Sequence, residues 1–238
     1  MQSFSEALRE ALVLLWQFDG ALREIILLSL YVSVSAVLVA ALIGLPLGAW
    51  LAVTQSRLRG VFIAFTTTLM GLPPVVVGLV VYLLLSNAGA LGPLQLLYTP
   101  TAMIIAQSIL VTPILIALTR ETLFSLHLDY NEQLSLLGVS LPGRVMTLLW
   151  EGRYGLMTAM LAGFGRAIAE VGAVIIVGGN INHVTRVMTT TIALETSKGN
   201  MALALGLGIV LVLIALVINA MVLLLSSGMR RQSAMIRH

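Results

Sequence analysis

Long apolar segments that are almost free of charged residues dominate this sequence. They lie at about 25–53, 61–86, 101–119, 155–179 and 201–225. An apolar run of roughly 18 or more residues is typical of a helix that crosses a lipid bilayer. Each segment must be helical, because an unpaired backbone group in lipid is costly. The sequence therefore predicts an all-α integral membrane protein with about five transmembrane helices, forming a single transmembrane domain over residues 1–238.

Composition agrees with a lipid environment. The chain is 59% hydrophobic and only 10% charged, whereas soluble domains carry about a quarter charged residues. Its net charge is +3, but the basic residues are spread singly between the apolar segments, which argues against a nucleic-acid partner. Cysteine is absent, so disulfides and thiolate metal sites are excluded.

The first 20 residues predict an amphipathic helix at the membrane surface. Apolar residues recur at helical spacing over 4–18, from Phe4 through Ala7 and Ala11 to Leu15. Glu6 and other polar residues occupy the remaining positions, as in an interfacial helix. The alternative is a frayed lead into the first span.

The distribution of Arg and Lys predicts the orientation. The segments after spans 1, 3 and 5 are rich in Arg, whereas the opposite side holds few basic residues. Because basic loops stay in the cytoplasm, the N-terminus is expected outside and the C-terminus inside the cytoplasmic (inner) membrane. Residues 120–154 then form the longest cytoplasmic loop.

Two short helices are expected in this loop. Asp129 and Glu132 have the spacing of a capping box, with Asp129 as the N-cap, and Gly138 is a suitable helix stop. Ser140 could cap a second helix that ends near Gly152. Such exposed helices are either a docking element or a connector lying on its own spans.

Prolines and glycines punctuate the spans. Pro73 and Pro74 remove backbone donors in the middle of the second span, and Pro46 and Pro113 do so in the first and third. Broken helices occur in membranes where they line a cavity or are packed in protein, so these prolines mark either a pathway or packing kinks. A Gly-x-x-x-Gly pair at 44–48 suits close helix contact.

Arg166 and Glu170 are intramembrane charges, four residues apart on one expected helix face. They could act on an anion in a translocation pathway, or form a structural lock between helices. Thr189 and Thr190, in a run that ends at Thr191, offer hydroxyl donors to an oxyanion. A similar run covers 66–68. In both runs the alternative is bonding to the carbonyl one helical turn back.

Two chemistries are missing. The single lysine, Lys198, lies between Ser197 and Gly199, which is not the Gly-Lys-Ser/Thr of a phosphate-binding loop. His127, His183 and His238 are scattered and imply no metal site. We therefore expect no catalytic residue, metal or cofactor in this chain.

Several motifs resemble those of ABC importer permeases. Glu132-Gln133-Leu134 followed by Gly138 resembles their EAA loop, although the two alanines are replaced. The proline-rich run at 71–78 and the Arg-Ala-x-x-Glu-x-Gly-Ala-like run at 165–173 resemble molybdate and sulfate permeases. The runs at 178–181 and 188–199 resemble the tungstate branch of that family.

This resemblance implies a type I ABC importer permease fold and a homodimer. It implies ATPase subunits that bind ATP and Mg, and an extracytoplasmic substrate-binding protein. Asp129, Glu132 and Gly138 would couple to the ATPase, and the cargo would be tungstate, or alternatively molybdate or sulfate. A stand-alone secondary transporter or channel is less favoured, since no second half forms an inverted repeat. An intramembrane enzyme is also less favoured, because the sequence contains no recognisable pair of nucleophile and base and no metal-binding motif.

Overall fold

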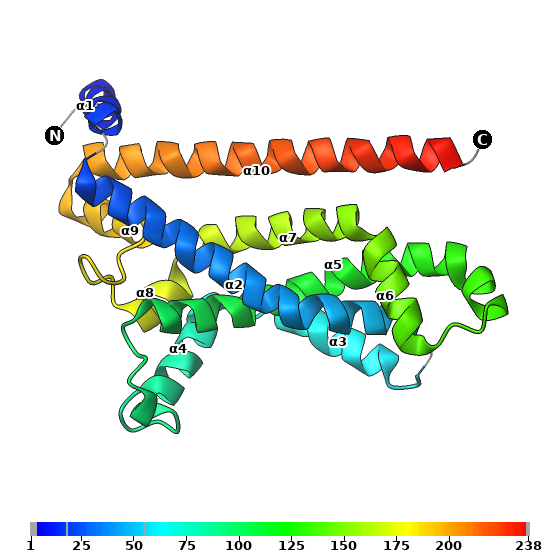
Figure 1. Ribbon diagram of the computed structural model, residues 1–238. Helices are drawn as coiled ribbons and strands as arrows, with labels where there is room; N and C mark the ends of the chain where they lie inside the picture. The colour runs from blue at the N-terminus through cyan, green and yellow to red at the C-terminus, as the bar shows by residue number, and fades with distance from the viewer. Residues whose placement is uncertain (1–3, 18, 55, 237–238) are drawn as a thin grey trace. The chain divides into compact units, whose positions relative to one another are not determined.

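The protein is helical throughout the part that the structure describes. The computed structural model describes residues 4–17, 19–54 and 56–236, with the backbone alone for 225–236. The helices, drawn in Figure 1, are α1 (Phe4–Gln17), α2 (Gly20–Val53), α3 (Arg59–Met70), α4 (Pro74–Leu85), η1 (Gly92–Leu94, a 3₁₀ turn), α5 (Pro100–Leu136), α6 (Leu141–Glu151), α7 (Arg153–Ile168), α8 (Gly172–Gly178), α9 (Met188–Lys198) and α10 (Met201–Ile236).

Five membrane spans account for most of these helices. Among the described residues α2, α5 and α10 are each long and apolar enough to cross a bilayer, with mean hydropathies of 2.6, 2.1 and 3.1. Two further spans are bent pairs: α3 meets α4 at 95°, and α7 meets α8 at 60°. Counted this way, the five predicted spans are confirmed.

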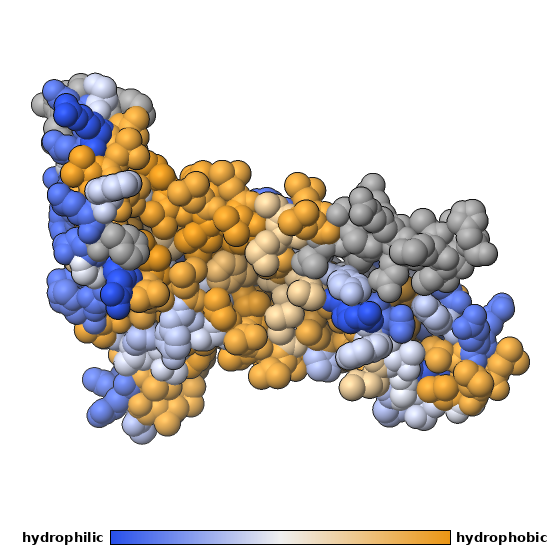
Figure 2. All heavy atoms as spheres, turned by 45° about the horizontal axis from the view of Figure 1, so that its top comes forward, coloured by the Kyte–Doolittle hydropathy of each residue, from blue (hydrophilic) through white to orange (hydrophobic). Residues whose placement is uncertain are grey.

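The outer surface of the helices suits lipid. Figure 2 shows hydrophobic side chains over most of the helix surface on the face it presents. Leu42 on α2 is 78% exposed and Leu224 on α10 is 72% exposed. Such side chains would be unfavourable in water, and in a bilayer they contact acyl chains.

The chain divides into two compact units. Unit 1 comprises Met1–Ala36, Pro73–Gln107 and Ala167–Ile218, and unit 2 comprises Val37–Leu72, Ser108–Arg166 and Asn219–His238. Every span therefore contributes residues to both units. The bend of the second span coincides with the junction at Leu72 and Pro73.

Small residues allow close helix packing in unit 2. A Cβ at Gly44 would lie 2.9 Å from Leu115 Cβ, and one at Gly48 would lie 2.6 Å from Thr119 Cβ. The glycine pair therefore sets α2 directly against α5, which confirms the predicted close contact.

Unit 1 holds the predicted amphipathic helix as α1. Its Ala7 and Ala11 are buried, and Ala11 contacts α10, where a Cβ at Gly206 would lie 3.7 Å from the Ala11 carbonyl oxygen. Figure 1 shows α1 at the ends where α2 and α10 begin. Two large apolar residues of α1 remain exposed, since Leu12 is 54% exposed and Trp16 is 92% exposed.

The helices differ in continuity from the expected spans. The helix of the third span continues past 119, because α5 runs to Leu136 with no glycine or proline after Pro113 to stop it. Pro46 and Pro113 both lie inside uninterrupted helices. The fourth span is instead interrupted after Ile168, before the glycine that begins α8.

Candidate functional site

The first component of the site is the break of the second span. α3 ends at Met70 and α4 begins at Pro74, after a sharp turn. Pro73 is extended (φ −62°, ψ 124°), as expected for a residue that precedes a proline. Its carbonyl oxygen accepts the N–H groups of Val76 (3.0 Å) and Val77 (3.2 Å). The two prolines thus end one half-helix and begin the next, which confirms that they break the span.

The second component is the break between α7 and α8, which contains Glu170. This residue is 4% exposed, and its Oε1 accepts the N–H of Ala173 in the first turn of α8 at 3.2 Å. Its own N–H donates to the Ala167 carbonyl at 3.1 Å. A carboxylate at the start of a helix satisfies a backbone donor that has no partner within the helix.

The two half-helices that follow these breaks pack directly together. A Cβ at Gly78 of α4 would lie 2.7 Å from the Cα of Ala173 on α8. A Cβ at Gly172 would lie 2.8 Å from Val75 Cγ2. α4 and α8 therefore approach closely within unit 1, and a side chain at Gly78 would meet the backbone of Ala173.

Buried polar side chains surround Glu170. They are Ser29, Ser33, Gln107 and Thr189. Together with Glu170, Val32, Ile168 and Val187 they line a cavity of about 10 Å³. Such a cavity holds about one water molecule, so in this conformation it is too small for an oxyanion.

The hydrogen bonds around the cavity tie four helices together. Gln107 Nε2 on α5 donates to the Ala167 carbonyl at 3.0 Å, and Thr189 Oγ1 on α9 donates to the Glu170 carbonyl at 2.8 Å. Ser29 Oγ on α2 accepts the N–H of Met188 at 2.8 Å. Gln107 Oε1 is buried and has no hydrogen-bond partner within the described part of the chain.

The threonine hydroxyls are engaged by the protein itself. Thr67 and Thr68 donate to the carbonyls of Ile63 and Ala64, each at 2.8 Å. Thr190 Oγ1 donates to Asn180 Oδ1 at 2.9 Å and accepts the N–H of Val187 at 3.2 Å. These bonds favour a structural role for both threonine runs over direct contact with an oxyanion.

The sequence indicated that Arg166 and Glu170 lie on one continuous helix. The structure shows that they do not, because α7 ends at Ile168. Arg166 is in the last turn of α7, and Glu170 follows the end of that helix. The four-residue spacing therefore no longer places their side chains on one helix face. Arg166 belongs to unit 2 and Glu170 to unit 1. Their roles remain predictions, although the contacts of Glu170 favour a structural one.

The 129–151 segment of unit 2 is a second candidate site. α5 ends in a Schellman motif, in which Gly138 N–H donates to the Ser135 carbonyl and Val139 N–H donates to that of Leu134, both at 3.1 Å. Gly138 has φ +64°, so the predicted stop is confirmed. Asp129, however, lies inside α5 and caps no separate helix. Its capping-box pattern starts no new helix, because α5 continues through it to Leu136.

This segment presents large apolar side chains. Leu136 is 89% exposed, Leu137 is 77% exposed, and Trp150 on α6 is 67% exposed. α6 begins after Ser140 as predicted, but the Ser140 side chain makes no capping bond. Arg144 fastens the turn instead, since its Nε donates to the Val139 carbonyl at 3.0 Å. The segment therefore exposes apolar side chains, and its turn is stabilised by the hydrogen bond from Arg144.

Sequence reasoning missed Gln107. An amide inside an apolar span was a detectable signal, because a buried polar side chain needs a partner. For metals, no group of three or more His, Cys, Asp or Glu side chains is placed to bind an ion among the described residues. His238 lies outside them.

Comparison with known proteins identifies the family. Residues 44–231 match the binding-protein-dependent transport system inner membrane component. The chain belongs to this family of ABC importer permeases. The permease is 42% identical to the tungstate uptake system permease protein TupB of Peptoclostridium acidaminophilum over 226 residues, or 93% of this chain and 97% of the relative.

Two other relatives are similar over most of the permease. A probable anion ABC transporter permease protein of Haloferax volcanii is 40% identical over 205 residues, which cover 84% of this chain and 88% of the relative. The tungstate uptake system permease protein TupB of Campylobacter jejuni is 36% identical over 197 residues, which cover 83% of this chain and 82% of the relative. The permease is therefore the multi-pass membrane subunit of an uptake system, and its family works with ATPase and substrate-binding partners.

Proposed function

We propose that the permease carries an oxyanion, with tungstate as the favoured cargo, into the cytoplasm as a homodimer driven by separate ATPase subunits. The similarity along nearly the whole chain to the permease of a tungstate uptake system carries this proposal. Molybdate and sulfate are the alternatives, because hydroxyl and backbone donors suit all three anions. A stand-alone secondary transporter or channel is the remaining alternative.

ATP and Mg²⁺ bind to the partner subunits in this proposal, and the permease itself has no catalytic site. Its single lysine lacks the flanking residues of a phosphate-binding loop. The ATPase docks on the 129–151 segment, which the exposure of Leu136, Leu137 and Trp150 supports. Arg57, Arg59, Arg120, Arg144 and Arg153 favour a cytoplasmic position for this side. The extracytoplasmic binding protein then meets the loops at 87–100 and 180–200.

Movement of the 129–151 segment reaches the pathway through the spans themselves. α5 is an uninterrupted helix from Pro100 to Leu136, so it connects the docking segment to Gln107 beside the Glu170 cavity. In this proposal a shift of α5 alters the packing of the half-helices α4 and α8. Their breaks at Pro73, Pro74 and Glu170 then act as the gate.

Uptake by the reconstituted transporter tests the proposal. The permease, its ATPase and its binding protein are placed in proteoliposomes with labelled tungstate, molybdate or sulfate. We expect ATP-dependent accumulation of tungstate, little accumulation without ATP, and weaker accumulation of the other anions. Equal uptake without the ATPase would support a stand-alone transporter or channel instead. Preferential uptake of molybdate or sulfate would replace tungstate as the cargo.

A further inference from the structure

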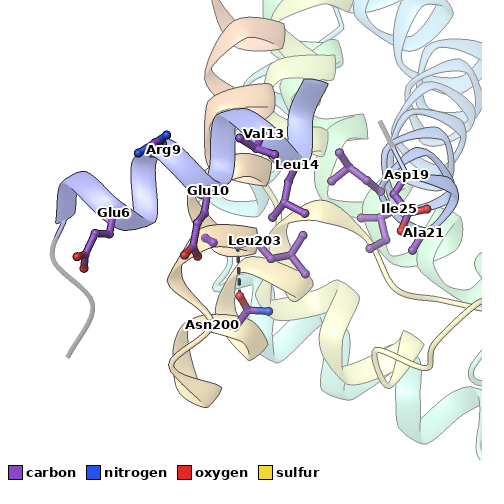
Figure 3. A pocket seen from close by; sticks show the side chains of 12 residues that line it. Glu6, Arg9, Glu10, Val13, Leu14, Asp19, Ala21, Ile25, Asn200 and Leu203 are labelled. Carbon is purple, nitrogen blue, oxygen red and sulfur yellow. Dashed lines mark hydrogen bonds between the residues drawn. The ribbon is translucent and has the colours of Figure 1, made fainter. Parts of the chain in front are cut away.

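A large hollow lies in unit 1 between α1, the start of α2 and the start of α10. Its volume is about 750 Å³, within the range of about 300–1,000 Å³ that small-molecule sites occupy. Figure 3 shows Leu14, Ile25 and Leu203 pointing into the space between α1 and α2, with Glu10 beside Asn200 at one edge. Val13 and Leu22 complete the apolar walls.

The polar edge of the hollow is acidic. Among the described residues that line it, Glu6, Glu10 and Asp19 carry carboxylates and Arg9 carries a guanidinium, so this part of the lining has a formal charge of −2. Asp19 Oδ1 accepts the N–H of Gly20 at 2.6 Å, which fixes its carboxylate at the start of α2. An occupant with a cationic group is therefore favoured over an anionic one.

The hollow lies next to the starts of two candidate membrane spans. The candidate spans α2 and α10 begin at Gly20 and Met201, and residues next to both starts line the hollow. α1 is amphipathic, and its exposed Trp16 is typical of the membrane–water interface. Apolar walls on the bilayer side and charges at the head-group level match an amphiphile of the membrane.

We propose that this hollow binds a zwitterionic phospholipid whose head group carries a primary amine. The ammonium donates hydrogen bonds to the carboxylates of Glu10 and Asp19, since a primary ammonium has three donors. Arg9 meets the negative charge of the phosphate. One acyl chain lies along Leu14, Leu22 and Leu203. The bound lipid fastens α1 to the spans it touches.

Lipid selectivity of the purified full-length permease tests the proposal. Binding of phosphatidylethanolamine, phosphatidylcholine and phosphatidylglycerol with identical tails is measured by native mass spectrometry and by the shift in thermal midpoint. Phosphatidylcholine keeps the positive charge but has no N–H donor. We expect phosphatidylethanolamine to bind at least about tenfold more tightly than either competitor. Equal binding of the three lipids, or preference for phosphatidylglycerol, overturns the proposal.

Two variants address the two halves of the site. The double variant Glu10→Gln, Asp19→Asn keeps side-chain shape and should abolish the ethanolamine preference. Its charge control is Glu121→Gln, because the side chain of Glu121 is 75% exposed and does not line the hollow. Ala21→Trp should fill the hollow and reduce retained lipid, with the exposed Leu42→Trp on the same helix as control.

The outcomes separate a lipid from other occupants. Unchanged lipid binding in both site variants overturns the proposal. If Ala21→Trp dissociates the oligomer while lipid selectivity is unchanged, a second copy of this chain fills the hollow instead. Should Ala21→Trp fail to fold, the wild-type selectivity and the double variant still decide.

Discussion

At the residue scale, the closest approach between half-helices depends on Gly78. We predict that Gly78→Ala lowers the free energy of unfolding by about 1–3 kcal/mol, the usual cost of overpacking. The added Cβ would lie 2.7 Å from Ala173 Cα, and a backbone atom cannot move aside cheaply. Thermal unfolding in detergent measures the effect. Gly208→Ala on α10 is the control, since nothing lies within 4 Å of its added Cβ. Equal midpoints for the two variants would contradict the packing seen between α4 and α8.

Substitutions at Glu170 separate a structural role from a role in anion transport. Glu170→Gln keeps an oxygen for the Ala173 N–H, whereas Glu170→Leu leaves that buried donor unpaired at about 1–3 kcal/mol. A structural lock predicts reduced yield of folded complex for Glu170→Leu, and predicts that Arg166→Gln combined with Glu170→Gln recovers part of the loss of either alone. An anion site predicts that Arg166→Gln assembles normally but loses oxyanion uptake. Normal assembly and uptake in every variant would exclude both roles.

Glu195 on α9 predicts a dependence of stability on pH. The hydrogen bond from Lys198 is the largest cause that lowers the pKa of this carboxyl below its ordinary 4.5, opposed by burial and assisted by Asn200. Because the folded pKa is lowered, the ionised carboxylate stabilises the fold above pH 4.5, and this stabilisation is lost as the pH falls through the lowered pKa. Midpoints of unfolding between pH 7 and pH 3.5 should fall less steeply for Glu195→Gln than for the wild type. Parallel curves would show that the pair contributes nothing.

At the scale of elements, the Schellman turn after α5 decides how the 129–151 segment is presented. Gly138 has φ +64° and no atom within 4 Å of an added Cβ, so a substitution there tests conformation without steric crowding. We predict that Gly138→Val costs about 1–3 kcal/mol of backbone strain and uncouples or dissociates the ATPase, while the permease still inserts. Gly138→Asn should retain coupling, because Asn tolerates the left-handed conformation. ATPase co-purification and uptake measure both variants, and a fully coupled Gly138→Val would mean that this turn is not part of docking.

At the scale of the whole molecule, the orientation in the membrane can be read by chemical labelling. The chain has no cysteine, so single cysteines report cleanly. Cysteines at Gln95 and His183 should react with an impermeant thiol reagent in intact spheroplasts, whereas one at the exposed Leu137 should react only after permeabilisation. The physical reason is the excess of Arg on the side that holds Leu137. The opposite labelling pattern would invert the topology.

Much of the architecture follows from local pattern. Five spans, the N-terminal helix α1, the break at Pro73 and Pro74 and the stop at Gly138 were all predictable, because apolar length, helical periodicity and the backbone limits of Pro and Gly act within a few residues. The close contact at Gly44 and Gly48 also follows from a short motif. Apart from that contact, whose partner is α5, these features do not depend on which distant segment packs against them.

The rest depends on partners far along the chain. Whether α5 stops near 119 or runs to Leu136 is decided by packing, since Leu123 is buried in a cluster with Ala49 of α2 and Leu148 of α6. The break after Ile168 is held by Glu170, which bonds to α8 and accepts a hydrogen bond from Thr189, and by Gln107, 60 residues away from Ala167. The spacing of Arg166 and Glu170 does not show that α7 ends between them, or which distant residue Glu170 contacts. Tertiary packing makes that choice, because a buried polar group bonds to whichever partner the fold brings within reach.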